Sequence, residues 1–201
     1  ALEVPYAVAT TSGSVALLLS LMGLDIGVGD EVIVPDRTWV ATAHAAVLLG
    51  AKVVLVDVRP DIPIMDVSQL KQKITSRTKA IMSVPLNGRG DGAEEIQQIA
   101  TENGLLVVED ACQALFSRYP GGFIGTQSDA GCYSLAVTKL ISTGQGGVVV
   151  TRSQSTYEQL KLVRNHGVVD YFTDAWNQMG FNFSLTQQFK CPYSVGNTRC
   201  P

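Results

Sequence analysis

The sequence lacks the features that mark several large classes of protein. Its 15 lysines and arginines are scattered and its net charge is −3, so the clustered positive charge of nucleic-acid binders and of proteins held on anionic membranes is missing. No apolar run approaches the roughly 18 residues that a membrane helix requires, and the first residues lack the basic and then apolar pattern of a secretion signal. We therefore expect a cytoplasmic protein that binds neither nucleic acid nor membranes.

Side chains that bind metals are also sparse. The sequence has only two histidines and four cysteines, and because no two cysteines form a CxxC pair, we expect no metal site. Cys112 and Cys132 lie in apolar surroundings and are expected to be reduced core thiols. Cys191 and Cys200 could form a disulfide, but one possible pair is weak support for secretion.

The composition and the spacing of apolar segments indicate one α/β domain. The chain has 201 residues, 46% of them hydrophobic and 16% charged, which is enough to bury a core. Segments with helical patterns separate short apolar runs typical of strands, at 31–35, 52–58, 80–84, 105–110 and 147–151. Continuous apolar strands of this kind favour a mostly parallel central sheet with helices on both faces, a three-layer αβα fold.

A turn that could bind phosphate follows the first extended segment, residues 6–10. Ser12, Gly13 and Ser14 precede an apolar stretch, 15–24, that predicts a buried helix. The free N–H groups at the start of that helix would lie at the positive end of its dipole, which favours an anion such as phosphate. A plain N-cap is the commoner role of such a turn, so both interpretations stay open at this point.

Three chemically active side chains follow later in the chain. Asp110 ends the predicted strand 105–110, Ser134 lies further on, and Lys139 is flanked by apolar side chains. Ligands of parallel sheets bind beyond the carboxyl ends of strands, so Asp110 and the Ser12–Ser14 turn are expected in one crevice. A lysine in apolar surroundings can be neutral and nucleophilic. The alternatives are a solvated surface lysine and an aspartate that only caps a turn.

Together these groups match what pyridoxal 5′-phosphate (PLP) requires of a protein. The cofactor needs a lysine for its aldehyde, a carboxylate for its pyridine nitrogen, donors for its phosphate and a flat side chain against its ring. Lys139, Asp110, the 12–14 turn with Ser134, and Trp39 would supply these in turn. On its own, Trp39 is more readily explained as a core residue.

The same motifs, in this order, resemble the DegT/DnrJ/EryC1/StrS family of PLP-dependent aminotransferases, fold type I enzymes that aminate keto sugars attached to nucleotides. The resemblance covers residues 5–189 and rests on SGSVAL (12–17), GDEVIVP (29–35), TWVATAHA (38–45), VVEDACQA (107–114), SLAVTK (134–139), TGQGGVVVT (143–151), RNHG (164–167) and GFNF (180–183). It implies that residues 1–189 form the large PLP-binding domain and that 190–201 are a tail, with the family's small C-terminal domain absent.

The resemblance also implies roles for single residues. Lys139 is similar to the Schiff-base lysine that shuttles protons, Asp110 to the partner of the pyridine nitrogen, and Gln113 to the residue beside the ring hydroxyl. The remaining cofactor contacts would come from Gly13, Ser14 and Ser134 on the phosphate and from Trp39 stacked on the ring.

Asn182 matches an asparagine that in this family reaches the phosphate of the neighbouring subunit's cofactor, which implies a homodimer with shared active sites. A lysine at 139, rather than a histidine, favours amino transfer over the family's sugar-dehydrase branch. Three departures from the family pattern are Leu140, where the family commonly has Asn, Gln145, where it usually has Glu, and Ser184, where it usually has Arg.

We therefore expect a PLP-dependent aminotransferase that moves an amino group from glutamate or glutamine to a keto sugar nucleotide. The alternative is a truncated, non-catalytic relative that serves as a binding or regulatory protein. The sequence leaves open the sugar, its ring position, the nucleotide and the role of His166.

Overall fold

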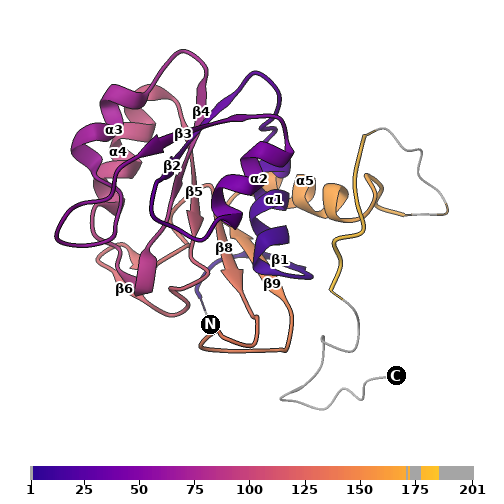
Figure 1. Ribbon diagram of the computed structural model, residues 1–201. Coiled ribbons are helices and arrows are strands. Elements are labelled where there is room, and N and C mark those ends of the chain that lie inside the picture. The colour runs from indigo at the N-terminus through magenta and orange to yellow at the C-terminus, as the bar shows by residue number, and fades with distance from the viewer. Residues whose placement is uncertain (1, 171, 173–177, 186–201) are drawn as a thin grey trace.

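A seven-stranded sheet forms the centre of the computed structural model, which describes residues 2–170, 172 and 178–185 (Figure 1). The strand order is β1-β9-β8-β5-β4-β2-β3, and β9 alone runs antiparallel to its neighbours in this sheet. The strands are β1 Tyr6–Thr10, β2 Glu31–Pro35, β3 Lys52–Val56, β4 Thr78–Ser83, β5 Leu106–Asp110, β8 Ala130–Ser134 and β9 Gly147–Thr151. The carboxyl ends of the six other strands therefore lie at one edge of the sheet.

Helices cover both faces of the sheet, as the sequence predicts. They are α1 Gly13–Gly23, α2 Ala41–Leu48, α3 Val67–Lys73, α4 Ala93–Asn103 and α5 Gln154–Arg164. The helices α1, α2 and α5 pack on one face, and α3 and α4 on the other (Figure 1). A short hairpin, β6 Arg118–Tyr119 with β7 Gly122–Phe123, and a 3-10 turn, Leu86–Gly88, complete the described elements. This is the expected three-layer αβα fold.

Side chains that alternate along each strand pack into two separate hydrophobic cores, one on each face of the sheet. On β2, Val34 contacts the layer of α1, α2 and α5, whereas Ile33 contacts the layer of α3 and α4. On β5, Val108 and Val107 divide in the same way. Side chains of consecutive strand residues point to opposite faces, so each strand seals both layers.

The first helix is buried because it lies between the sheet and two other helices. Its N-cap is Ser12, whose Oγ accepts a hydrogen bond from the Val15 N–H at 3.2 Å. Leu17, Leu19 and Leu21 are almost completely buried around its circumference. The helix therefore has little amphipathic character, as its uniformly apolar sequence predicts.

Two predicted boundaries are wrong. The sequence predicts a helix that opens at Trp39, but α2 begins at Ala41 because residues 36–40 form a turn, in which the Thr42 N–H bonds to the Trp39 carbonyl at 3.1 Å. The predicted strand 52–58 ends at Val56, and Val58 instead forms an isolated bridge with Met65. The proposed tail, 190–201, lies outside the described residues.

Candidate active site

A cavity of about 300 Å³ opens at the carboxyl edge of the sheet, a size typical of sites for small ligands. The loops after β1 and β2 and the ends of β5 and β8 line it. Of the eight residues that the sequence singles out, seven line this one cavity: Gly13, Ser14, Trp39, Asp110, Gln113, Ser134 and Lys139. Residues separated by more than a hundred positions in the chain therefore meet at one site.

The N-terminus of α1 forms one wall of the cavity. Its first two N–H groups, those of Gly13 and Ser14, donate to no other described residue, as expected at the start of a helix. A Cβ on Gly13 would lie 2.7 Å from Ser134 Cβ and 3.0 Å from Cys112 Sγ. Because Gly13 has no side chain, the start of α1 can lie close to the end of β8, where Ser134 also lines the cavity and offers its hydroxyl. Two free N–H groups and nearby hydroxyls form a cradle that fits a phosphate.

A second glycine holds this wall against β9. A Cβ on Gly147 would overlap the carbonyl group of Ser12. The TGQGG segment is therefore needed for close backbone contact with the Ser12–Ser14 turn.

Asp110 presents its carboxylate at the floor of the cavity. The residue is 5% exposed. Its Oδ2 lies 2.7 Å from the Thr42 hydroxyl, and its Oδ1 accepts a longer bond, 3.3 Å, from the Cys112 N–H. The carboxylate is therefore held from two elements, α2 and the turn after β5.

Lys139 lies in the turn after β8, on the cavity wall. Its N–H donates to the Ala136 carbonyl at 3.0 Å, which closes the turn. Its amine forms no hydrogen bond or ion pair with any other described residue. The amine is thus available to a ligand in the same cavity that contains Asp110.

Trp39 and Gln113 lie at the rim. The Trp39 side chain is 71% exposed, so its interpretation as a core residue is wrong. Gln113 is likewise exposed. An exposed indole over a cavity is free to cover a flat ligand, which agrees with the expected stacking role without establishing it.

Asn182 is the one predicted site residue that does not line this cavity. It is exposed and forms an isolated antiparallel bridge with Asn165 at the end of α5. Its Oδ1 accepts a 3.4 Å hydrogen bond from the Ser184 N–H. His166 is also outside the lining, and its N–H bonds to the Phe181 carbonyl at 3.2 Å. The RNHG and GFNF motifs therefore anchor one another.

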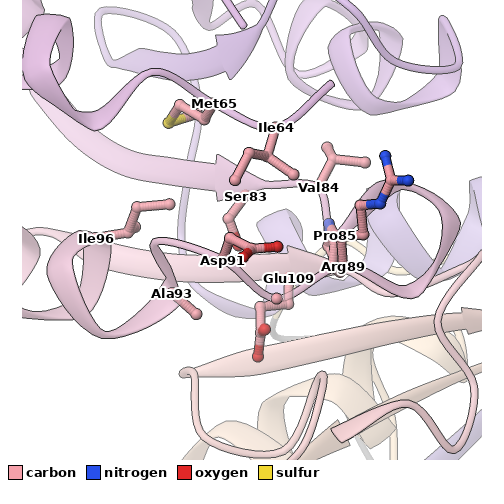
Figure 2. A pocket seen from close by; sticks show the side chains of 11 residues that line it. Ile64, Met65, Ser83, Val84, Pro85, Arg89, Asp91, Ala93, Ile96 and Glu109 are labelled. Carbon is pink, nitrogen blue, oxygen red and sulfur yellow. The ribbon is translucent and has the colours of Figure 1, made fainter. Parts of the chain in front are cut away.

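Other cavities lack this combination of groups. Glu109, next to Asp110 in sequence, lines a cavity of about 20 Å³ on the opposite face together with Ile64, Arg89 and Ile96 (Figure 2). It also lines a cleft of about 470 Å³ beside α4 that contains no basic side chain. Burial raises the pKa of the Glu109 carboxyl, while hydrogen bonds from the Ser128 hydroxyl and the Gly125 N–H oppose that rise. Neither cavity offers both an amine and a phosphate cradle.

Among the residues that the structure adds to the cavity are Thr38, Cys112 and Gln145 in the lining and Thr42 behind it. Burial and the nearby Asp110 carboxylate raise the pKa of the Cys112 thiol, so it is no thiolate nucleophile at neutral pH. Cys112 and Cys132 are free, as expected. Local sequence patterns give no signal for Thr42, because its contact with Asp110 joins residues that lie 68 positions apart.

In the described part of the chain, no helix is long and apolar enough to cross a membrane. No group of three or more His, Cys, Asp or Glu side chains there is placed to hold a metal ion.

The seven-stranded, mostly parallel sheet with helices on both faces is the fold of the type I aminotransferases to which the chain is similar. Residues 1–191 match the family model described as the DegT/DnrJ/EryC1/StrS aminotransferase family. The chain belongs to this family, and the resemblance inferred from the motifs is confirmed.

The chain is also similar in sequence and structure to individual named proteins. The chain is 38% identical over 184 residues to GDP-perosamine synthase of Escherichia coli O157:H7, covering 92% of this chain and 50% of that protein. It is 39% identical over 185 residues to a UDP-N-acetyl-3-dehydro-alpha-D-glucosamine 3-aminotransferase of Acidithiobacillus ferrooxidans, covering 92% and 50%. The crystal structure of NtdA from Bacillus subtilis with bound cofactor PMP superposes with a TM-score of 0.85 at 30% identity, covering 92% of this chain and 42% of that one. The chain thus spans about half the length of these relatives.

Proposed function

We propose that this chain is the cofactor-binding part of a PLP-dependent aminotransferase that transfers an amino group from glutamate or glutamine to a keto sugar nucleotide. The observation that carries the proposal is the meeting of Lys139, Asp110 and the start of α1 in one cavity. The cradle beside Gly13 fits the phosphate of the cofactor. Asp110 and Lys139 line the same cavity, which would also contain the ring attached to that phosphate.

Different residues would bind different parts of the cofactor. The N–H groups of Gly13 and Ser14 and the Ser134 hydroxyl would bind the phosphate at the positive end of the α1 dipole. Asp110 would keep a proton on the pyridine nitrogen, and Trp39 would cover the ring. Gln113 would lie beside the ring hydroxyl.

When bound, PLP supplies an electron sink for negative charge at the α-carbon of an amino acid. Lys139 would anchor the cofactor before the amino donor arrives. Once released, its amine would take a proton from the α-carbon of the donor and return it on the cofactor side, which is general acid–base catalysis by a positioned group. Among the described residues the amine of Lys139 has no carboxylate partner, so it is available for this step.

The names of the relatives support a proposal for the class of substrate. One is named for a GDP sugar and another for amino transfer to a UDP-linked keto sugar. The PMP in NtdA is the aminated form of PLP, the form that would carry the amino group between the two half-reactions. We therefore infer a nucleotide-linked keto sugar as the acceptor and a role in amino-sugar biosynthesis.

A homodimer with shared active sites completes the proposal. Asn182 lies outside the cavity of its own chain, on a segment anchored to the end of α5. Its family role on the phosphate would then be performed in the site of a second subunit. The exposed apolar side chains near the cavity, including Trp39, Val137 and Leu140, support a surface that is covered in a dimer.

The experiment that tests the function uses the full-length protein loaded with PLP. A yellow absorbance band should form on loading and bleach when glutamate or glutamine is added. A panel of keto sugar nucleotides should then restore the band as the amino group leaves. Cofactor that binds but does not respond to any amino donor would reject catalysis and support a binding or regulatory protein.

A further inference from the structure

The Thr42 hydroxyl lies beneath the cavity in contact with Asp110. Thr42 is fully buried on the first turn of α2. Its Oγ1 is 2.7 Å from Asp110 Oδ2, 2.9 Å from Thr38 Oγ1 and 2.9 Å from the Trp39 carbonyl oxygen. A hydroxyl has one proton to donate, so only one of these neighbours receives it at a time.

The surroundings of Thr42 direct that proton to Asp110. The Trp39 carbonyl already accepts a hydrogen bond from the Thr42 N–H at 3.1 Å, so it remains satisfied without the hydroxyl. Thr38 can itself act as the donor to Thr42. The contact with Asp110 is the shortest of the three, and bonds to an ionised acceptor are the stronger ones.

We propose that Thr42 is a positioning residue that fixes the Asp110 carboxylate for the pyridine nitrogen of the cofactor, an inference that rests on the proposed function. Among the described residues, Cys112 also contacts that carboxylate, through its N–H at the longer distance of 3.3 Å and through its thiol. Without Thr42 the carboxylate would have no short hydrogen bond to hold its rotamer. Thr42 does not itself line the cavity, so it acts through Asp110.

The turn that leads into α2 presents both the proposed cover of the ring and the support of its acid. Trp39 lines the cavity, and Thr42, three residues later, contacts Asp110 from behind. The Thr38 hydroxyl contacts the Thr42 hydroxyl, so a row of hydrogen bonds runs from Thr38 through Thr42 to Asp110. A shift of this turn would therefore disturb the ring and its acid together.

Three variants of the full-length protein test the proposal. Thr42→Val removes the hydroxyl and keeps the shape, Thr42→Ser keeps the hydroxyl, and Thr151→Val is the control. Thr151 is also a buried threonine whose hydroxyl donates to a backbone carbonyl, that of Asp129 at 2.7 Å, but it is remote from the cavity. If Thr42→Val does not fold, Thr42→Ala against Thr42→Ser makes the same comparison.

The first readout is PLP affinity, followed by the absorbance spectrum of the bound cofactor across pH. Thr42→Val should weaken PLP binding about tenfold, the scale of a lost hydrogen bond to a charged group, and should shift the pH at which the spectrum changes. Thr42→Ser should stay within about threefold of the unmodified protein on the same scale. Thr151→Val should lower thermal stability without changing either cofactor property.

A double-mutant cycle separates positioning from a merely structural role. In an Asp110→Asn background, adding Thr42→Val should cost little further PLP affinity, because the carboxylate that it supports is already gone. An undiminished tenfold loss in that background would overturn the proposal, and so would an unchanged affinity and spectrum in Thr42→Val alone. Failure of the unmodified protein to bind PLP would instead reject the proposed function, so the two failures are distinct.

Discussion

Glu109 and Asp110 are consecutive residues of β5, yet their carboxyl groups lie on opposite faces of the sheet in different cavities. Asp110 shares the face of Val108, toward α1 and α2, and Glu109 shares the face of Val107, toward α4. The alternation of a strand therefore assigns one acid to the candidate active site and the other to the packing of the hairpin 118–123.

This pair supplies a matched comparison of two acids. Asp110→Asn should leave PLP bound but lower amino transfer on the order of a hundredfold, the scale of removing one preorganised electrostatic group. Glu109→Gln should leave amino transfer nearly unchanged, because that side chain does not line the cavity. Steady-state kinetics of both variants make the measurement. Equal losses in the two variants, or none in Asp110→Asn, would contradict the assignment.

Gly13 should tolerate no side chain. In Gly13→Ala the new methyl group would meet Ser134 and Cys112, and overpacking of this kind costs about 1–3 kcal/mol. If α1 moves away to relieve it, the phosphate cradle opens and PLP affinity should fall about tenfold. Fluorescence titration with PLP measures this. Gly27→Ala is the control, since its nearest neighbour would be the Leu49 carbonyl oxygen at 3.9 Å; a similar loss there would refute the steric explanation.

Because of Glu31, the free energy of unfolding should depend on pH in the acid range. Its carboxylate accepts hydrogen bonds from the Thr75 hydroxyl at 2.6 Å, Arg77 at 2.8 Å and Lys52 at 3.0 Å. These contacts lower its pKa from 4.5 to about 2. Because the unfolded chain binds the proton more tightly, this stabilisation is complete above pH 4.5 and is lost as the pH falls toward 2.

Urea unfolding at several pH values measures the effect. Glu31→Gln should be less stable than the unmodified protein at pH 7, and the difference should shrink in acid. The exposed Glu95 on α4 gives the control Glu95→Gln, which should follow the unmodified protein. A stability difference for Glu31→Gln that does not change with pH would show that the carboxylate contacts are not its source.

Shared active sites predict complementation between inactive subunits. Lys139→Ala alone should abolish the yellow band and amino transfer, and Asn182→Ala alone should weaken PLP binding enough to leave it inactive at a limiting concentration of PLP. Unfolding and refolding the two variants together should produce mixed dimers in which one of the two sites is intact. Half of the dimers would be mixed, so about one quarter of the unmodified activity should return. If no activity returns although mixed dimers form, each site is built from one chain.

Much of the fold and most of the candidate site can be predicted from the sequence. The apolar runs at 31–35, 105–110 and 147–151 coincide with strands, because buried parallel strands need apolar side chains on both faces. The meeting of Asp110 with the Ser12–Ser14 turn follows from the shared carboxyl edge of a parallel sheet. Lys139 falls in the same cavity through its place after β8.

The rest depends on tertiary contacts that local patterns do not record. Thr42 reads as one more small residue of an Ala-rich helix, and its bond to Asp110 joins positions 68 residues apart. Trp39 reads as a core residue because its size favours burial, whereas the turn before α2 leaves it exposed at the rim. The proposed role of Asn182 involves a second subunit, which no property of a single chain determines.

The most direct test of the account asks which lysine holds the cofactor. The full-length protein is loaded with PLP and reduced with borohydride, which makes the bond between cofactor and lysine permanent, and peptide mass spectrometry then locates the added mass. The account predicts the modification on Lys139, with none of it on that peptide in Lys139→Ala. Modification of a different lysine, or none at all under conditions that saturate PLP binding, would contradict it.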